Sequence, residues 1–331
     1  MEIPERSATA EAGANIALTK YWGNADDELR IPTNDSISLT LDRARAVTAA
    51  SFRPDLAEDE VTVDGRALTG PALQRVSDQL DLCRGLAGTT WRARVVSRCN
   101  FPTSTGIASS AAGFAALTVA SAAALGLQLS TRKLSRLARR GSGSAARLIF
   151  GGFALLHGDV GDQEACADPL CGPDWWEVCD LVVVLSRVEK DVPSSVGQRL
   201  AHTSPLHAAR VAHVAELNHR LLAALAERDF AALGQVAEQD ALLMHAVMMT
   251  SRPALLYWLP ETLALMRRVR QWREEGIPTY FTIDAGPNVH VTDPARARRA
   301  AAGRSGSRPR CARGARLSPR RCGAGDRTAH P

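Results

Sequence analysis

The first 180 residues alternate short apolar runs, rich in β-branched residues, with stretches dominated by alanine. The short runs are bounded by turn residues and predict strands. They lie at residues 47–52, 61–63 and 91–96. The stretch 109–125 is almost entirely small and apolar, which is typical of a helix packed closely against a sheet. Another helix is predicted at 134–139, and Gly-Ser-Gly-Ser at 141–144 interrupts the pattern before a second helical stretch, with Ser144 as its N-cap.

The pattern changes near residue 180, where the apolar run 180–186 predicts a buried strand. Three longer amphipathic segments follow and predict helices. They lie at residues 205–227, 230–248 and 261–275. A strand at 279–283, a loop at 284–288 and a strand at 289–291 complete the predicted elements.

The length of 331 residues exceeds the size at which single cores usually stop growing, so two lobes are expected. We predict an α+β protein with an N-terminal lobe at 1–180, a C-terminal lobe at 181–293 and a ligand cleft between them. From 294 to 331 the sequence is rich in arginine, glycine, serine and proline, without a hydrophobic period. This composition predicts a disordered tail.

The composition is that of an ordinary globular protein, with 45% hydrophobic and 23% charged residues. No apolar run approaches the roughly 20 residues needed to span a bilayer. The N-terminal residues Met-Glu-Ile-Pro-Glu-Arg lack the basic and apolar regions of a signal peptide. We therefore expect a cytoplasmic protein without a membrane partner. The seven cysteines form no CxxC pair, which is typical of reduced thiols rather than of a metal site.

The formal net charge of +5 is unevenly distributed along the chain. Residues 294–331 contain eleven arginines and one acid, so this segment carries +10 and the rest of the chain about −5. The basic segment also lacks aromatic residues that could stack on bases. A basic tail on an acidic body is not a basic groove, and we expect no nucleic-acid partner.

The segment 100–113, Asn-Phe-Pro-Thr-Ser-Thr-Gly-Ile-Ala-Ser-Ser-Ala-Ala-Gly, carries the strongest chemical signal. A Pro/Gly/Ser loop here runs directly into the alanine-rich helix, and exposed amides at a helix start bind anions. Gly106 permits close approach of phosphate oxygens, while Ser109 and Ser110 can bind them or a bridging Mg²⁺. The alternative is a serine-capped packing helix. The candidate cofactor-binding residues are Asn100, Pro102, Gly106, Ser109 and Ser110, the two serines also being candidates for the metal of Mg-ATP.

This loop resembles the phosphate-binding segment of the galactokinase, homoserine kinase, mevalonate kinase and phosphomevalonate kinase superfamily. Three further parts of the chain are similar to the diphosphomevalonate decarboxylases within it. They are Ala-Asn-Ile-Ala-Leu-Thr-Lys-Tyr-Trp-Gly at 14–23 with the segment 31–41, Gly-Ser-Gly-Ser-Ala-Ala-Arg at 141–147 with Gly-Gly-Phe at 151–153, and Asp-Ala-Gly-Pro-Asn at 284–288. The resemblance runs from about residue 14 to 292, with the motifs in the family's order.

The resemblance implies a two-lobed fold of the small-molecule kinase superfamily, with a ribosomal-S5-like N-terminal ATP/phosphate-binding lobe and a ferredoxin-like C-terminal lobe. It implies ATP-dependent decarboxylation of 5-diphosphomevalonate to isopentenyl diphosphate, with ATP and Mg²⁺ as cofactors and a homodimer as the assembly. ATP would first phosphorylate the tertiary hydroxyl, and loss of phosphate would then drive the departure of CO₂.

The same resemblance assigns the catalytic residues. Asp284 would act on the C3 hydroxyl as base or orienting acceptor, and Lys20 would contact the phosphorylated oxygen or Asp284. Arg147 would hold the substrate carboxylate, because a guanidinium matches a carboxylate bidentately. Without the family, Asp284 would be read as a turn former and Arg147 as a surface arginine.

Four further residues are assigned to substrate binding. Ser142 and Ser144 would bind the substrate's carboxylate and phosphate, although Gly-Ser-Gly-Ser alone would be read as a linker. Tyr21 would line the substrate phosphate, with core packing as its alternative. Ser195 would contact the substrate from 188–197, which resembles the family's loop that closes over substrate.

Two departures from the family concern the substrate. Members usually read Lys-Tyr-Trp-Gly-Lys, whereas this chain has Asn24 at the second lysine. Several bacterial members place an arginine after the Ser-Ser of the closing loop, where this chain has Val196. Both cations are associated with the diphosphate, and a hydrogen bond to a charged group contributes about 1.5–3 kcal/mol. The alternative substrate is therefore 5-phosphomevalonate, giving isopentenyl phosphate.

The end of the chain departs from the family as well. Relatives continue beyond residue 292 with a helix and a last strand, whereas this chain becomes rich in arginine. A shifted reading frame near Thr292 is our hypothesis for this tail. Loss of the last strand would expose a sheet edge and apolar surface.

Two more classes of function stay open on the sequence alone. A small-molecule kinase of the same superfamily would stop at the phosphorylated alcohol, although a kinase needs no carboxylate clamp. A nucleotide-binding protein without catalysis would arise if the altered tail collapses the cleft.

Overall fold

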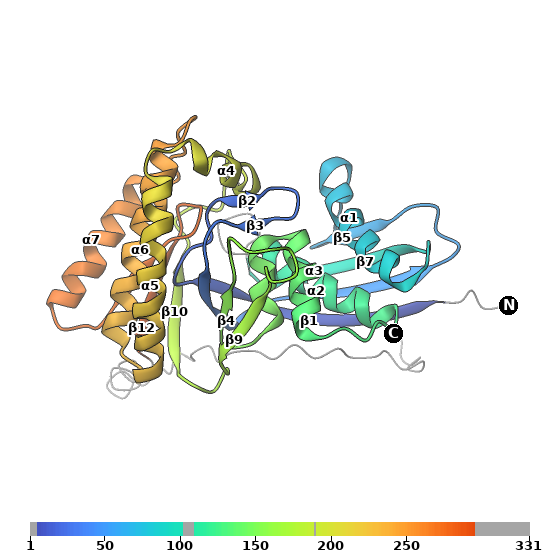
Figure 1. Cartoon of the computed structure of the whole chain (residues 1–331), viewed down its shortest axis with the longest axis horizontal. Helices are drawn as coiled ribbons and strands as arrows, with labels where there is room; N and C mark the ends of the chain where they lie inside the picture. Colours follow the sequence, from blue (N-terminus) through green and yellow to red (C-terminus); the bar gives the residue numbers. More distant parts are fainter. Residues whose placement is uncertain (1–4, 102–108, 189, 295–331) are drawn as a thin grey trace, which may run out of the picture.

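The computed structural model describes residues 5–101, 109–188 and 190–294. It is an elongated α+β molecule in which a long sheet occupies one end and a group of long helices the other (Figure 1). The α+β class predicted from the sequence is confirmed. The predicted tail at 294–331 lies, beyond its first residue, outside the described residues.

The larger sheet has seven strands in the order β6-β5-β7-β4-β8-β9, and β1 also pairs with β4. All neighbours are antiparallel except β5 and β7. The strands are β1 (Arg6–Ala17), β4 (Ser36–Arg53), β5 (Glu60–Val63), β6 (Arg66–Ala67), β7 (Arg92–Cys99), β8 (Phe153–Leu156) and β9 (Ala167–Cys171). The run predicted at 47–52 is only the second part of β4; the first part, in which Ile37, Leu39 and Leu41 alternate with serine and threonine, was not predicted as a strand.

Three helices and a short 3-10 helix accompany this sheet. They are α1 (Gly70–Ala87), α2 (Ser109–Ala124), α3 (Thr131–Gly141) and the 3-10 helix η1 (Gly143–Ile149). Alanines of α2 are almost fully buried and pack on β1 and β4, because small side chains let a helix approach a sheet closely. The predicted N-cap is wrong: Ser142 precedes η1, and Ser144 lies inside it.

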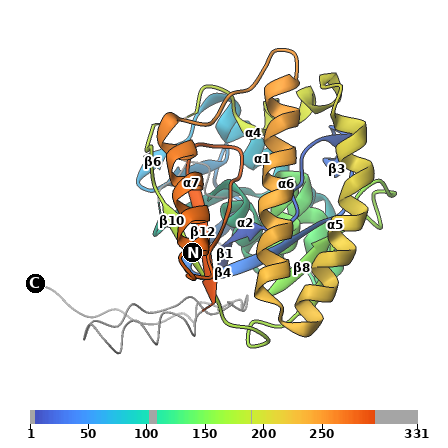
Figure 2. The same cartoon turned by 90° about the vertical axis from the view of Figure 1, so that its left-hand side faces the viewer.

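The second sheet has three strands in the order β10-β12-β11, all antiparallel. Its strands are β10 (Val178–Val183), β11 (Tyr280–Thr282) and β12 (Val289–Pro294), and a separate pair is formed by β2 (Asn24–Asp26) and β3 (Ile31–Pro32). The helices are α4 (Ser194–Leu200), the 3-10 helix η2 (Ala201–Thr203), α5 (His207–Glu227), α6 (Phe230–Thr250) and α7 (Pro260–Glu274). The three long helices run along one side of the molecule (Figure 2).

Local chemistry explains where α6 begins. Asp229 accepts hydrogen bonds from the backbone N–H groups of Ala231 and Ala232, at 2.9 and 3.0 Å, and so caps the helix. Farther along, Gly234 packs directly under the Tyr280 ring of β11, where a Cβ atom would lie 2.1 Å from the ring. The cap fixes the start of α6, and the glycine lets it approach the small sheet.

A shared core joins the two sheets. Ile16 and Leu39 of the large sheet pack in one buried cluster with Leu217 and Leu221 of α5 and Val236 of α6. The chain therefore buries apolar side chains across the junction between its two halves. The division at 180/181 remains a prediction about folding units.

Two remaining expectations concern thiols and membranes. Cys83, Cys99, Cys166 and Cys171 are free thiols. Cys179 is not among these free thiols. None of the helices in the described part of the chain is long and apolar enough to cross a bilayer.

Candidate active site

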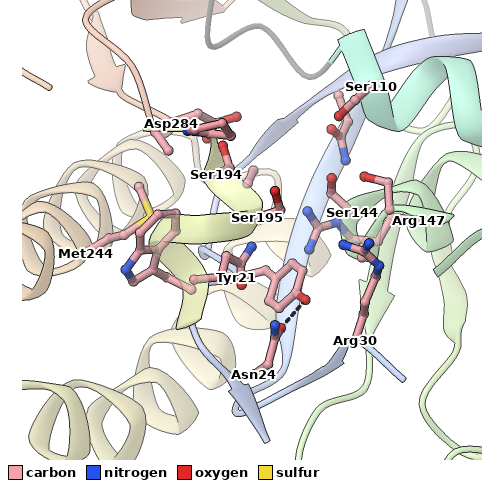
Figure 3. A pocket seen from close by; sticks show the side chains of 18 of the residues that line it. Tyr21, Asn24, Arg30, Ser110, Ser144, Arg147, Ser194, Ser195, Met244 and Asp284 are labelled. Carbon is pink, nitrogen blue, oxygen red and sulfur yellow. Dashed lines mark hydrogen bonds between the residues drawn. The ribbon is translucent and has the colours of Figure 1, made fainter. Parts of the chain in front are cut away.

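A cavity of about 300 Å³ lies where the two sheets and the helices converge (Figure 3). Its wall is built from β1 and the segment after it, from η1, from α4 and from the turn that follows β11. Seven of the predicted site residues line it: Tyr21, Ser110, Ser142, Ser144, Arg147, Ser195 and Asp284. Sequence motifs separated by more than 250 residues thus share one cavity.

Asp284 and Lys20 form an ion pair at the wall of the cavity. The distance from Lys20 Nζ to Asp284 Oδ1 is 2.6 Å, and Nζ also donates to the carbonyl of Ala17 at 2.7 Å. The Lys20 side chain is 1% exposed and that of Asp284 is 22% exposed. Burial by itself raises the pKa of Asp284, but the positive charges of Lys20, His290 and Arg147 outweigh it and lower that pKa. The carboxylate is therefore held ionised.

The backbone of Lys20 is fixed by a second buried ion pair. Arg210 of α5 and Asp240 of α6 lie 3.0 Å apart and are 1% and 0% exposed. Arg210 also donates to the carbonyl of Lys20 at 2.9 Å. A fully buried arginine needs this compensation, and here it ties the lysine segment to both long helices.

The backbone of Asp284 is held by a tight turn and by α6. The N–H of Gly286 donates to the Asp284 carbonyl at 2.7 Å, and His245 Nε2 lies 3.1 Å from the same oxygen. Burial lowers the pKa of His245 to about 3, so its imidazole is neutral and donates to that carbonyl. The carboxylate consequently faces the cavity from a rigid support.

Arg147 of η1 is buried, with 2% exposure, and it lines the cavity. It donates to Ser36 Oγ, and its Nε has no partner among the described residues. Burial lowers its pKa to about 10, and the charge of Asp284 raises it in part. A buried guanidinium with unused donors favours an anionic ligand, because an unpaired buried charge is costly.

Tyr21 and Asn24 lie at another part of the wall. The Tyr21 hydroxyl donates to Asn24 Oδ1, and Asn24 Nδ2 donates to Asp27 at 2.7 Å (Figure 3). Burial raises the pKa of Tyr21, against the lowering effect of nearby arginines. A Cβ atom at Gly143 would lie 2.1 Å from the Tyr21 ring, so glycine is required for this contact.

The segment predicted to close over substrate also reaches the cavity. Ser194 and Ser195, in the first turn of α4, both line it. Lys190 lines it as well and donates to Ser194 Oγ at 2.6 Å and to the Ala285 carbonyl at 2.8 Å. This segment is thereby attached to the turn that carries the catalytic candidate Asp284.

The predicted cofactor-binding residues do not all lie at the cavity. Ser110, in the first turn of α2, is exposed and lines the cavity. Asn100 does not line it: its amide accepts from the Arg45 N–H and donates to the Arg43 carbonyl, each at 2.7 Å. The Asn100 side chain therefore binds the backbone of β4 in the large sheet. Pro102, Gly106 and the side chain of Ser109 lie outside the described residues.

Several cavity residues are not among the predicted site residues. Arg30 and Arg75 line the cavity, and Ser36 holds Arg147. Arg30 lies in a turn and Arg75 on an amphipathic helix, where arginines are usually solvent-exposed. Only the long-range packing of the chain reveals their position, so no local signal could have identified them.

This fold and this site define a class: a two-lobed α+β enzyme that holds an ionised acid and buried cations around a small anionic substrate. The family model "Diphosphomevalonate decarboxylase-like N-terminal domain" matches residues 12–167, and "Mevalonate 5-diphosphate decarboxylase C-terminal domain" matches 180–298. The chain belongs to the diphosphomevalonate decarboxylase family, a family of ATP-dependent decarboxylases.

Individual relatives agree with this assignment. The phosphomevalonate decarboxylase of Haloferax volcanii is 36% identical over 285 residues, covering 86% of this chain and 87% of the relative. The diphosphomevalonate decarboxylase of Candida albicans is 34% identical, covering 86% and 83%. The structure of MDDEF in complex with MVAPP, AMPPCP and magnesium is 37% identical, with a TM-score of 0.89, covering 96% of this chain and 100% of that one. The mevalonate diphosphate decarboxylase of Staphylococcus aureus has the same TM-score at 35% identity, covering 96% and 99%.

Proposed function

We propose that this chain catalyses the ATP-dependent decarboxylation of 5-diphosphomevalonate to isopentenyl diphosphate, releasing ADP, phosphate and CO₂. The observation that carries the proposal is the presence of the Lys20–Asp284 pair and the buried Arg147 in one cavity. An ionised carboxylate suits activation of a hydroxyl, and a guanidinium suits a carboxylate that will leave as CO₂.

Asp284 is the proposed base for the C3 hydroxyl of the substrate. Its carboxylate is ionised because Lys20 lies 2.6 Å away, and it can accept the hydroxyl proton as the oxygen attacks phosphorus. Lys20 also places a positive charge where negative charge develops on that oxygen. Both groups are held by buried contacts, so little reorganisation is needed at the moment of reaction.

Arg147 is the proposed binding group for the substrate carboxylate. Its Nε has no partner among the described residues, and the cavity lies beside it. A planar guanidinium holds a carboxylate in a fixed orientation, which aligns the bond to be broken with the leaving phosphate. Ser142, Ser144, Ser195 and Tyr21 are the proposed neutral contacts to the carboxylate and the phosphate.

The residues at the start of α2 fit a nucleotide phosphate. Ser110 lies in its first turn and reaches the cavity, where the positive end of the helix dipole favours anions. ATP would supply the phosphoryl group that converts the tertiary hydroxyl into a leaving group. The MDDEF complex with AMPPCP and magnesium supports ATP and Mg²⁺ as cofactors. Ser109 and Ser110 are the proposed contacts to Mg-ATP, together with Asn100, Pro102 and Gly106 of the preceding loop.

The cellular location and the oligomeric state are also proposed. We expect the enzyme to act in the cytoplasm, on a small-molecule substrate of the mevalonate pathway, and to form a homodimer as is common in the family. Size-exclusion chromatography with light scattering measures the assembly directly.

Product analysis tests the function. The purified chain, given ATP, Mg²⁺ and 5-diphosphomevalonate, is expected to release CO₂ and ADP in equal amounts and to form isopentenyl diphosphate. Asp284→Asn is expected to reduce kcat by about 10²- to 10⁴-fold, since it removes the base. Asp55→Asn, an exposed acid paired with Arg53, serves as the control and should leave kcat unchanged.

Different products would identify a different function. ADP formation without CO₂ would indicate a kinase, and binding of ATP without turnover would indicate a nucleotide-binding protein. Preferred turnover of 5-phosphomevalonate would indicate the monophosphate reaction, the activity in the name of the Haloferax relative.

A further inference from the structure

Two arginines outside the proposed catalytic set line the same cavity. Arg30 and Arg75 are both partly buried, and neither forms an ion pair with a carboxylate in the described part of the chain. Asp27 is the acid that acts electrostatically on Arg30, but its carboxylate accepts a hydrogen bond from Asn24. Two cations close together without a counter-ion are unfavourable unless an anion joins them.

The end of helix α3 holds both guanidinium groups. Arg30 Nε donates to the carbonyl of Arg140 at 2.9 Å. Arg75 donates to the carbonyl of Gly141 through Nε and a terminal nitrogen, at 3.1 and 2.8 Å, while its guanidinium lies over the Phe114 ring. The last carbonyls of a helix lack intrahelical partners and carry partial negative charge. They orient the arginines without neutralising them, and the remaining N–H donors form no hydrogen bond with the part of the chain that the structure describes.

The backbone of Arg30 is also fixed. Its φ of 53° lies in the left-handed region, which is disfavoured for a residue with a side chain. The carbonyl of the preceding Leu29 accepts a hydrogen bond from Arg139, a fully buried residue paired with Asp162. A buried network therefore holds the β2–β3 hairpin on α3 and keeps Arg30 at the cavity.

The charges of the two arginines affect each other. Burial lowers the pKa of both groups, and the charge of Arg30 further lowers the pKa of Arg75, to about 10. Each guanidinium is thus less stable as a cation than it would be in water, and a bound phosphate would remove that penalty. Asn24 offers no charge here, since its amide is used by Tyr21 and Asp27.

We propose that Arg30, with Arg75, binds the terminal phosphate of the substrate's diphosphate and supplies the charge that Asn24 does not. Arg30 lies across the cavity from Asp284, on the side of Tyr21 and Asn24 (Figure 3). With C3 at Asp284 and the carboxylate at Arg147, the phosphate tail extends toward this arginine pair. The proposal rests on the proposed function for the identity of the ligand, but the anion site itself does not require catalysis.

Arg30→Met, Arg30→Lys and the control Arg66→Met, on the exposed strand β6, test the proposal. Calorimetry would measure the binding of inorganic pyrophosphate and inorganic phosphate to each protein. Arg30→Met is expected to weaken pyrophosphate binding by about 10- to 100-fold, the effect of losing a hydrogen bond to a charged group. Arg30→Lys should recover part of it, and the control should match the parent chain.

Kinetics then assign the phosphate. Arg30→Met should raise KM for 5-diphosphomevalonate at least tenfold, raise KM for 5-phosphomevalonate much less and leave KM for ATP unchanged. Unchanged pyrophosphate affinity in a folded Arg30→Met protein, or equal losses on both substrates, would overturn the assignment. If the parent chain releases no CO₂ while Arg30→Met still loses pyrophosphate affinity, the proposed function fails and the anion site stands.

Discussion

Lys20 controls the protonation state of Asp284. Burial of the carboxylate opposes ionisation, and the lysine 2.6 Å away reverses that effect, so the pKa of Asp284 is lowered rather than raised. A base with a lowered pKa is ionised, and can therefore accept a proton, over the whole neutral pH range. The same lowering makes it a weaker base. The Lys20–Asp284 pair thus keeps a buried carboxylate ionised in a cavity that must also bind an anionic substrate.

Removing the lysine should reverse the sign of the shift. In Lys20→Met the burial effect dominates, the pKa of Asp284 rises, and the acidic limb of the kcat profile moves to higher pH. At neutral pH we expect kcat to fall by about 100-fold, because charge stabilisation is also lost. The pH dependence of kcat checks this, with Lys133→Met on α3 as the control. An acidic limb at unchanged pH would contradict the assigned role.

At the scale of elements, the site depends on close contacts that only glycine permits. The 3-10 helix η1 brings Arg147 to the cavity while Gly143, at its first position, packs against Tyr21. The same chain segment reads as a flexible linker in the sequence. In the structure it is a buried turn, because Ser142, Gly143, Ala145 and Ala146 are all enclosed by neighbouring elements.

Gly143→Ala should displace Tyr21, since the new methyl group would lie 2.1 Å from the ring. We expect a loss of about 1–3 kcal/mol in the free energy of unfolding, the usual effect of overpacking, and a KM for the phosphorylated substrate about tenfold higher. Urea denaturation and steady-state kinetics measure both quantities. The matched control is Gly85→Ala in α1, where a Cβ atom meets nothing within 4 Å and stability should be kept or improved. Equal behaviour of the two variants would disprove the steric argument.

At the scale of the whole molecule, the two long helices α5 and α6 hold both halves of the site. Arg210 and Asp240 fix the backbone of Lys20, and His245 fixes that of Asp284. The packing that joins the sheets is therefore also the packing that aligns the catalytic pair. Stability and activity should change together when these buried polar groups are altered.

His245 makes stability depend on pH. Its pKa is about 3 in the folded protein and 6.5 ordinarily, so the unfolded chain binds the proton more tightly. Its contribution is complete above pH 6.5 and is lost as the pH falls toward 3, by up to about 1.4 kcal/mol per unit. His290, paired with Asp180, has a raised pKa and the opposite dependence at higher pH.

His245→Gln should therefore flatten the loss of unfolding free energy between pH 6.5 and 4.5, although it lowers stability at neutral pH. Urea denaturation across that interval gives the measurement, and His219→Gln, an exposed residue of α5, is the control. Parallel curves for the parent chain and His245→Gln would show that other groups cause the pH dependence.

Local sequence patterns predicted many of the helices and strands. The alanine-rich stretch predicted α2, and the three amphipathic segments predicted α5, α6 and α7. The apolar run near 180 predicted β10, but the expected burial is wrong, because β10 lies first in the order β10-β12-β11 and Leu181 is 38% exposed. Each signal is a local pattern of apolar residues, either continuous or periodic, that lies within the element it predicts. The long strand β4 was predicted only in its second part. Ser144 was predicted to be the N-cap of the following helical segment, but Ser142 occupies that position.

The sequence by itself determined the family and most of the cavity wall, because the motifs around Lys20, Arg147, Ser195 and Asp284 are contiguous and chemically specific. Only the tertiary structure decided that Arg30 and Arg75 face the cavity without an ion-pair partner among the described residues, and that Asn100 forms hydrogen bonds in the large sheet instead. The reason is physical: whether an arginine is solvated, paired or held for a ligand depends on groups far away in the chain, here the end of α3, which no local pattern encodes.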